Sequence, residues 1–245
     1  LKAGEVPLLV GETGIGKTRL LDIATDELIS AGYQSLVGRS PEAPGTPAFW
    51  PWIQILREHF DTPLPGGLGM AITGSEGVVH LLPELRRHAD TSAIPTPQDP
   101  AQARFTMFDA ITTCLDRAAR KLPTVITLED IHRADEASLL LLSFLVTSLP
   151  NCPLLLLASY RDGIHTTAFS KTLTSLHRAT STHCLPLDGL DYAETAHLLS
   201  ALTGATTDAD VARALHERTK GNPYFLAHLA RHLEANREMK ELALP

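Results

Sequence analysis

An eight-residue motif near the start of the chain constrains its fold more than any other feature. Residues 11–18 read Gly-Glu-Thr-Gly-Ile-Gly-Lys-Thr and match the pattern G-x-x-x-x-G-K-[ST] in full. An apolar run, Val6–Val10, precedes the motif, and a helical pattern over 18–30 follows it. Because a phosphate-binding loop needs this strand–loop–helix context, the sequence predicts an α/β fold that binds a nucleotide.

The chemistry of the motif assigns roles to its residue types. Its glycines allow successive backbone N–H groups to point inward and form a cradle for an anion, and the following helix adds its positive N-terminal dipole. We expect Lys17 to place a charge on the β- and γ-phosphates of ATP, and the Thr18 hydroxyl to ligate Mg²⁺. The predicted nucleotide-binding residues of this segment are Gly11, Thr13, Gly14, Ile15, Gly16, Lys17, Thr18 and Arg19.

A pair of acidic residues follows an apolar run in the middle of the chain. Residues 125–128 lead directly into Glu129 and Asp130. Side chains that follow a buried parallel strand emerge at the carboxyl edge of the sheet, where ligands bind in open α/β folds. We expect Glu129 to hold the water shell of Mg²⁺, and Asp130 to orient or deprotonate an attacking water. The alternative is a strand followed by a solvated Glu-Asp turn.

Apolar runs that alternate with helical patterns predict a parallel sheet with crossover helices. The predicted strands are Val6–Val10, 34–38, 124–128, 154–159 and 183–187. One helical stripe is formed by Phe105, Phe108, Ile111, Leu115 and Ala118. The segment 137–149 is apolar nearly all round, which predicts a buried helix.

Two further segments shape the domain organisation. Residues 41–100 hold ten of the 17 prolines, and we interpret them as a Pro/Gly-rich insertion with short helices at 52–60 and 77–88. Trp50 and Trp52 in this insertion are interpreted as packing anchors. After residue 186 the sequence predicts three amphipathic helices, over 192–202, 209–219 and 224–233. We therefore divide the chain into a nucleotide-binding domain, 1–188, and a helical lid, 189–245.

Composition narrows the classes of function. With 21 Lys and Arg against 28 Asp and Glu, the formal charge of −7 argues against binding nucleic acid by bulk charge. Three widely spaced cysteines without a CxxC pair argue against a zinc ribbon or a disulfide scaffold, and favour a reducing, cytoplasmic compartment. The longest apolar stretch, 139–146, is far shorter than the roughly 20 residues of a membrane span. A core strand follows closely on Leu1, so we interpret the chain as a segment of a longer protein.

Four segments resemble motifs of one protein class. Residues 129–135, Glu-Asp-Ile-His-Arg-Ala-Asp, are similar to the DDLHWAD signature of signal-transducing ATPases with numerous domains. Residues 45–52 look like the GAPAYWPW loop of that class, 158–162 like its GTYRD segment, and 221–225 like the GNPFF of its helical lid. Within the class, the chain most resembles the AAA-like ATPase domain of large ATP-binding LuxR-type and SARP-type transcriptional regulators.

This resemblance implies a P-loop NTPase fold and roles for four further residues. Arg161 would be the sensor-1 arginine that reaches the γ-phosphate, and Pro223 would pack near the adenine. His132 and Asp135 would brace the loop after the acids. The resemblance also implies nucleotide-dependent self-association, and contact with DNA only through an output domain outside this chain.

The chain departs from the class at three points. Glu129 stands where the class usually has aspartate, which leaves the division of roles between Glu129 and Asp130 open. Arg133 replaces the usual tryptophan, so that loop is more polar. The segment that contacts the base upstream of the phosphate loop in this class is missing from the sequence given.

The leading hypothesis is an ATP-binding, slowly hydrolysing, Mg²⁺-dependent switch domain of a multidomain signalling or transcriptional regulator. Its ligands would be ATP and ADP, and its partners the flanking domains of a longer chain. The alternative is a non-hydrolysing, nucleotide-bound interaction module whose partner site lies in 41–100. The lid motif argues against a small-molecule kinase. His228 and His232 lie four residues apart but lack a third ligand, which favours a solvated helix face.

Overall fold

The structure is a computed structural model that divides into two compact units. The first comprises residues 1–9 and 21–185, and the second comprises 10–20 and 186–245. The segment that contains the predicted phosphate loop therefore groups with the C-terminal helices. The structure describes residues 5–43, 45–61, 73–89, 99–148, 152–163, 166–179, 182–204 and 208–242, the last ten of these by their backbone alone.

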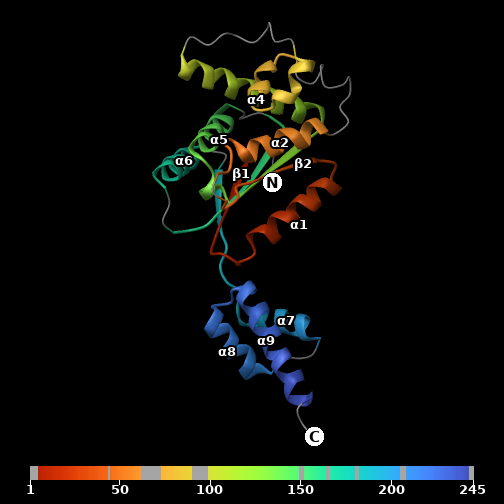
Figure 1. Ribbon diagram of the computed structural model, residues 1–245. Coiled ribbons are helices and arrows are strands. Elements are labelled where there is room, and N and C mark those ends of the chain that lie inside the picture. The colour runs from red at the N-terminus through yellow and green to blue at the C-terminus, as the bar shows by residue number, and fades with distance from the viewer. Residues whose placement is uncertain are drawn as a thin grey trace. The chain divides into compact units, whose positions relative to one another are not determined.

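A five-stranded sheet forms the centre of the α/β fold (Figure 1). Its order is β2-β3-β4-β1-β5, and β2 pairs in parallel with β3, as β3 does with β4. Every residue of β3 and β4 is buried, as expected for strands covered on both faces. The predicted parallel sheet is confirmed. The strands are β1 (Val6–Val10), β2 (Gln34–Arg39), β3 (Thr124–Glu129), β4 (Leu154–Tyr160) and β5 (Thr182–Pro186).

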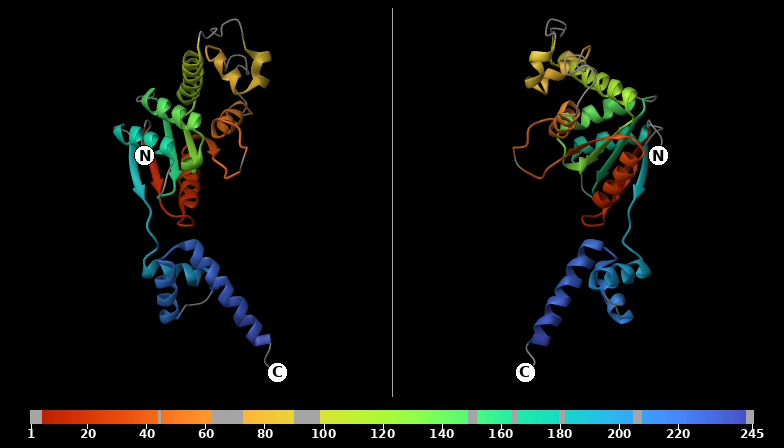
Figure 2. Two further views of the ribbon diagram at one scale, coloured as in Figure 1. Left: turned by 60° about the vertical axis from the view of Figure 1, so that its left-hand side comes forward. Right: turned by 90° about the vertical axis from the view of Figure 1, so that its right-hand side faces the viewer.

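Helices flank this sheet, as Figures 1 and 2 show. The Thr25 hydroxyl lies 3.3 Å from the Thr127 hydroxyl of β3, which fastens α1 to the sheet. Trp52 of α2 is 1% exposed and donates from its indole Nε1 to the Ser138 carbonyl oxygen of α5 at 3.1 Å. Trp52 is therefore a packing anchor, as predicted. The helices are α1 (Lys17–Ser30), α2 (Trp50–Asp61), α4 (Pro100–Lys121), α5 (Glu136–Ser148) and α6 (Thr167–Arg178).

The predicted insertion is only partly described. Residues 62–72 and 90–98 lie outside the described residues, so their interpretation as loop stays a prediction. The single helix expected over 77–88 is instead two 3-10 helices, η1 (Glu76–His80) and η2 (Pro83–His88). Pro83 explains the break, because proline disfavours the helical conformation at the preceding residue and lacks an N–H donor.

Two expectations about the core are wrong in part. Leu140 on α5 is 38% exposed, so this helix is not buried all round. Phe105 on α4 is 60% exposed, whereas the remaining members of its stripe, Phe108, Ile111, Leu115 and Ala118, are buried. Both side chains line the same hollow between α4 and α5.

Among the described residues after 186, the second unit has three helices, as the sequence predicts, but the third continues to Leu242 instead of ending at 233. Their common core is formed by Leu199, Ala212 and Ala230. Asp191 and Glu194 form a capping box at the start of α7, and Gly204 ends that helix in the left-handed conformation. None of the helices in the described residues is both long and apolar enough to cross a membrane. The helices are α7 (Tyr192–Thr203), α8 (Ala209–Thr219) and α9 (Pro223–Leu242).

Candidate nucleotide-binding site

The phosphate loop has the backbone conformation that its sequence predicts. Gly14 and Gly16 have φ angles of 81° and 109°, a region that residues with a Cβ adopt only with strain. α1 begins at Lys17, directly after the second of these glycines. Loops of this kind, which end at a helix N-terminus, present backbone N–H groups to anions.

The ammonium group of Lys17 lies over the start of this loop. Its Nζ donates to the carbonyl oxygens of Gly11 and Glu12, both at 2.8 Å. The side chain is buried, with a residue exposure of 8%. These bonds hold the lysine charge within the loop rather than in solvent.

Residues of the lid motif bind the phosphate loop directly. Asn222 Nδ2 donates to the Thr13 carbonyl oxygen at 3.0 Å, and the Tyr224 N–H donates to the Gly14 carbonyl oxygen at 3.2 Å. Asn222 Oδ1 also accepts from the Tyr224 N–H at 3.2 Å, next to the first residue of α9, Pro223. Sequence reasoning singled out Pro223 and missed Asn222, although the resembling motif 221–225 contains both.

The chain that leads into the lid also approaches the loop closely. The Leu187 N–H donates to the Val10 carbonyl oxygen at 2.8 Å, and the Leu190 N–H donates to the Gly221 carbonyl oxygen at 2.9 Å. Gly221 has a φ of 71°, and a Cβ there would overlap the Leu190 carbonyl oxygen. The glycine of the lid motif is therefore required by backbone packing.

Glu129, the first acidic residue, lies in the first unit at the end of β3. Its side chain is 10% exposed, and its Oε1 accepts from Arg39 Nε at 2.7 Å. Arg39 ends β2 and is the register partner of Glu129. The hydrogen bond and the charge of Glu129 raise the pKa of the Arg39 guanidinium. Sequence reasoning missed Arg39, because only the register of two strands 90 positions apart brings it to the acid.

Asp130 has a backbone conformation that is uncommon outside glycine. Its φ is 54°, and its N–H donates to Ser159 Oγ of β4 at 3.2 Å. Its side chain is 42% exposed, and its Oδ1 lies 4.0 Å from His132 Nδ1. The same nitrogen accepts from the Arg161 N–H at 3.3 Å. His132 therefore joins the segments after β3 and β4, consistent with the bracing role expected for it.

Asp135 braces the same region by a different route. Its carboxylate accepts from the Phe49 N–H at 3.1 Å, the Ser138 N–H at 2.9 Å and the Ser138 hydroxyl at 2.5 Å. These bonds tie the segment before α2 to the first turn of α5. Arg161, the residue after β4, has an exposed side chain.

The donor atoms proposed for Mg²⁺ fit the chemistry of that ion. Thr18 and Glu129 offer a hydroxyl and a carboxylate, which are the hard oxygen ligands that Mg²⁺ prefers. Among the described residues, no group of three or more His, Cys, Asp or Glu side chains gathers as a cage for a metal. Mg²⁺ at a phosphate loop needs no such cage, because water and the substrate phosphates complete its coordination.

Comparisons with known proteins agree with this fold. The family described as AAA ATPase domain matches residues 2–157. Two RuvB variants from Thermotoga maritima superpose on the chain with TM-scores of 0.51 and 0.50, at 14% and 15% identity. The alignments cover 97% and 94% of this chain, and 57% and 54% of the RuvB chains. The chain thus spans little more than half the length of those structures.

A third similar structure is a signal transduction ATPase with numerous domains (STAND) and a tetratricopeptide repeat sensor, from Pyrococcus horikoshii. It is 15% identical, with a TM-score of 0.47, over 90% of this chain and 26% of that protein. No curated protein matches the chain in sequence. At these identities the RuvB structures establish the fold, a parallel sheet flanked by helices as in P-loop NTPases.

Proposed function

Because the chain belongs to the AAA ATPase domain family, we propose that it binds ATP through residues 11–19 and hydrolyses it. The observation that carries this proposal is the loop itself. Gly14 and Gly16 have the positive φ angles of an anion-binding turn, and two hydrogen bonds hold the Lys17 ammonium over the loop. A fixed cation, a glycine turn and a helix N-terminus together suit a chain of phosphates.

Three residues serve the phosphates in this proposal. Lys17 exchanges its carbonyl partners for β- and γ-phosphate oxygens, which makes ATP affinity depend on its charge. Thr18 and Glu129 are the residues that would hold Mg²⁺. When bound, this ion neutralises negative charge on the phosphates.

The remaining site residues serve the reaction and the base. Asp130 accepts a proton from water as the water oxygen bonds to the γ-phosphorus and the bond to the bridging oxygen of ADP breaks. Arg161 stabilises the charge on the transferred phosphoryl group. Pro223 packs near the adenine, as the family resemblance implies.

The output of the site would be a change in the lid. Asn222 and Tyr224 bond to the carbonyl groups of Thr13 and Gly14, so a loop movement on nucleotide binding reaches α9 through two hydrogen bonds. A nucleotide would shift the equilibrium between two positions of the lid if it binds one of them more tightly than the other. We propose a boundary near residue 188 between a nucleotide-binding domain and this lid.

The wider setting rests on the motif resemblance. We propose a cytoplasmic regulator in which this domain gates self-association and a DNA-binding output domain. LuxR-type and SARP-type regulators are the resembling examples. In that setting the switch acts on DNA through another part of the protein, consistent with the acidic charge of this chain.

One observation favours the alternative of a non-hydrolysing, nucleotide-bound module. Glu129, the acid proposed to face the metal, already accepts a hydrogen bond from Arg39. If that ion pair persists with nucleotide bound, Glu129 cannot turn fully toward Mg²⁺, and ATP would be held rather than cleaved. Hydrolysis is the main proposal because Asp130, the second acid, is 42% exposed and pairs with no arginine among the described contacts; its carboxylate instead lies 4.0 Å from His132 Nδ1.

A single-turnover assay with ATP labelled at the γ-phosphate tests the proposal. We expect the wild-type chain to release phosphate, and Asp130→Asn to bind ATP without cleaving it. Lys17→Ala should lower ATP affinity by about tenfold or more, because a charge-assisted contact is lost. Lys121→Ala, which removes an exposed lysine from α4, is the matched control. Unchanged affinity in Lys17→Ala would overturn the phosphate-loop assignment, and tight ATP without phosphate release would favour the module.

A further inference from the structure

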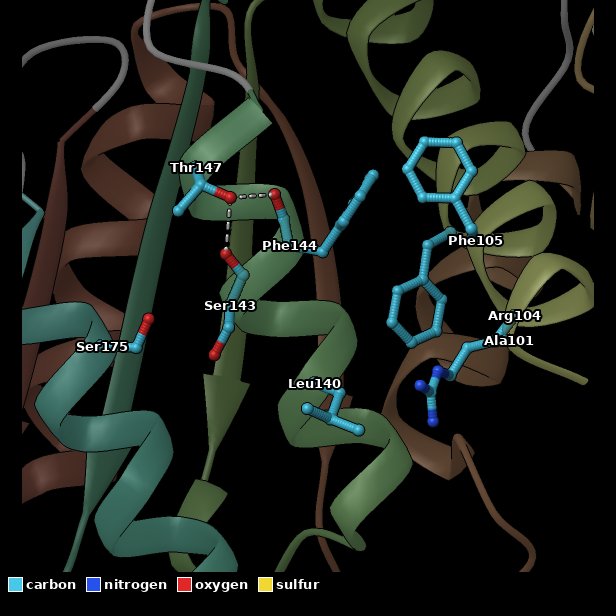
Figure 3. A pocket seen from close by; sticks show the side chains of 9 residues that line it. Ala101, Arg104, Phe105, Leu140, Ser143, Phe144, Thr147 and Ser175 are labelled. Atoms are coloured by element: carbon cyan, nitrogen blue, oxygen red, sulfur yellow. Dashed lines mark hydrogen bonds between the residues drawn. The ribbon is translucent and has the colours of Figure 1, made fainter.

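Three helices of the first unit form an open groove that the proposed function does not use. α4, α5 and α6 line two adjoining hollows of about 430 and 470 Å³. The hollows share Thr147 and Ser175, so they form one continuous depression. We call this depression the three-helix groove. Figure 3 shows the part that lies between α4 and α5.

The lining residues follow helical spacing on all three helices. On each helix they recur at intervals of three and four residues, and the first and last of the four are seven residues apart. Seven residues make two helical turns, so each stripe is about 10 Å long. In Figure 3 the α5 stripe runs between Ser175 on one side and the α4 side chains on the other. The stripes are Ala101, Arg104, Phe105 and Phe108 on α4; Leu140, Ser143, Phe144 and Thr147 on α5; and Lys171, Thr174, Ser175 and Arg178 on α6.

One end of the groove is apolar and exposed. Phe105 is 60% exposed and Leu140 is 38% exposed. The Phe105 ring meets the Phe144 ring edge-to-face, with centroids 5.7 Å apart, and Phe144 lies 5.7 Å from Phe108. These contacts fix the aromatic wall in place. Single exposed apolar residues are common on protein surfaces, but a concave apolar patch two turns long indicates a binding surface.

The charged residues that line the groove are all cations. Arg104 stands on α4, and Lys171 and Arg178 stand seven residues apart on α6. The neighbouring acids, Asp109 on α4 and Glu136 on α5, are exposed and do not line the groove. The cationic lining of the groove is thus opposite in sign to the net charge of the whole chain, which is −7.

We propose that the three-helix groove binds an acidic amphipathic helix of a partner protein. Two turns on each of the three helices match the ridge of an added partner helix, which packs its apolar residues between neighbouring helices. Apolar side chains of the partner would cover Phe105 and Leu140. Acidic side chains along its flank would face Arg104, Lys171 and Arg178, which sets the direction of the bound helix.

Two synthetic peptides probe this chemistry on the complete 245-residue chain. Each is a fluorescein-labelled helix of about 16 residues with Leu and Phe at i, i+3/i+4 and i+7, the spacing of one helix face. One carries Glu at the flanking positions and the other carries Lys. By fluorescence anisotropy, we expect the Glu peptide to bind at least about tenfold more tightly than the Lys peptide, because the groove cations attract one and repel the other.

Variants locate that binding. Phe105→Glu and Lys171→Glu should each weaken the Glu peptide by about tenfold, since each removes a contact and adds a repelling charge. Ile29→Glu changes an apolar residue of α1 that is 50% exposed, and Lys121→Glu reverses a lysine outside the groove. Both controls should bind the peptide as the wild type does. ATP binding and circular dichroism should remain unchanged in Phe105→Glu, which shows that the variant folds.

Several results would overturn the proposal. The proposal is wrong if the Glu peptide does not bind, or if both peptides bind equally tightly. It is also wrong if Phe105→Glu binds the Glu peptide as tightly as the wild type does. A wild-type dimer in sedimentation that Phe105→Glu abolishes would assign the groove to a second copy of the chain. Binding of decanoate in place of the peptide, with the same dependence on Phe105, would assign it to a small amphipathic acid.

Discussion

Arg39 donates from its Nε to Oε1 of Glu129 at 2.7 Å, and the two residues are register partners at the ends of β2 and β3. The carboxylate side chain is 10% exposed and the arginine side chain 63% exposed. A nearly buried acid is thus neutralised by a cation that reaches it from the surface. The pairing of β2 with β3 brings these two residues together. The same hydrogen bond therefore stabilises the sheet and fixes the position of Glu129, a proposed metal ligand.

Replacement of Arg39 should destabilise the fold more than replacement of an ordinary surface arginine. Arg39→Ala takes a cation at 2.7 Å away from the nearly buried Glu129 carboxylate, and we expect the free energy of unfolding to fall by about 1 kcal/mol after allowance for the exposure of Arg39. Arg57→Ala is the control, because its ion pair with Glu84 is half exposed on both sides. That variant should change the value by less than about 0.5 kcal/mol. Urea denaturation measures both, and equal effects would contradict this reasoning.

Asn222 should couple lid stability to nucleotide affinity through its two amide atoms. Asn222→Ala removes the bond to Thr13 and the contact with the Tyr224 N–H, and should lower the free energy of unfolding by about 1–2 kcal/mol. Asn222→Asp keeps an acceptor for Tyr224 but loses the donor to Thr13, and it adds a negative charge beside a phosphate loop.

We therefore expect Asn222→Asp to be more stable than Asn222→Ala and yet to bind ATP about tenfold more weakly than the wild type. Denaturation and fluorescence titration with a labelled ATP measure the two effects separately. If both variants lose stability and affinity in the same proportion, the two amide atoms do not have separate roles.

A methyl group at Gly14 should disrupt the contact between the loop and the lid. Gly14 has a φ of 81°, and its added Cβ would lie 2.6 Å from Tyr224 Cβ, which no rotation of a side chain can relieve. Gly32 has a similar φ of 90° but has no atom within 4 Å of that position. Gly32→Ala should cost only about 1 kcal/mol of backbone strain. Gly14→Ala should cost more and weaken ATP binding, as calorimetry can determine.

His59 should make the fold sensitive to mild acid. Its Nδ1 is buried without a hydrogen-bond partner among the described residues. Burial, with a smaller effect from the Lys121 charge, lowers the pKa of His59 below its ordinary value of 6.5. The unfolded chain therefore takes up a proton below about pH 6.5 that the native state resists. This contribution to stability is complete above that pH and is lost as the pH falls.

Urea denaturation between pH 5 and pH 8 tests this behaviour. We expect His59→Leu to lose less stability than the wild type as the pH falls from 7 to 5. His177→Leu, which changes an exposed histidine of α6, should keep the wild-type dependence. If the free energy of unfolding of His59→Leu depends on pH as that of the wild type does, other groups cause the acid sensitivity.

The three thiols should differ in reactivity. Burial raises the pKa of Cys114 to about 12, and burial together with a hydrogen bond to Asp116 raises the pKa of Cys152 to about 12. Cys184 on β5 is exposed. Because the thiolate is the reactive form, Ellman's reagent at pH 8 should modify one thiol rapidly in the native chain. Cys184→Ser should abolish this fast phase, and a second fast thiol in that variant would contradict the burial of the other two.

Features encoded in short segments were predictable. The phosphate loop, the acidic pair at the end of β3 and the lid helices all lie within a few residues of the signals that identify them. Asn222 and Arg39 were not identified, for different reasons. Asn222 lay inside a recognised motif but carried no sign of its partner, Thr13. Arg39 ended a short strand, and a charged residue in that place carries no information about the strand beside it.

Phe105 illustrates the same limit in the core. Its spacing from Phe108 and Ile111 indicates one helical face, and helical periodicity does not reveal where the covering surface stops. The structure buries the later residues of the stripe and leaves Phe105 exposed. An exposed residue at the end of an apolar stripe can be recognised only when the neighbouring helices are in place.

By itself, the sequence determined the chemistry of this protein: a glycine loop that ends in Lys17 and Thr18, and two acids after an apolar strand. Such chemistry is local, because a loop of a few residues sets its own backbone angles and donors. Only the tertiary structure decided that Arg39 pairs with Glu129, that Asn222 bonds to Thr13, and that α4, α5 and α6 line one groove. These outcomes depend on strand order and helix packing, which join residues that the sequence holds far apart.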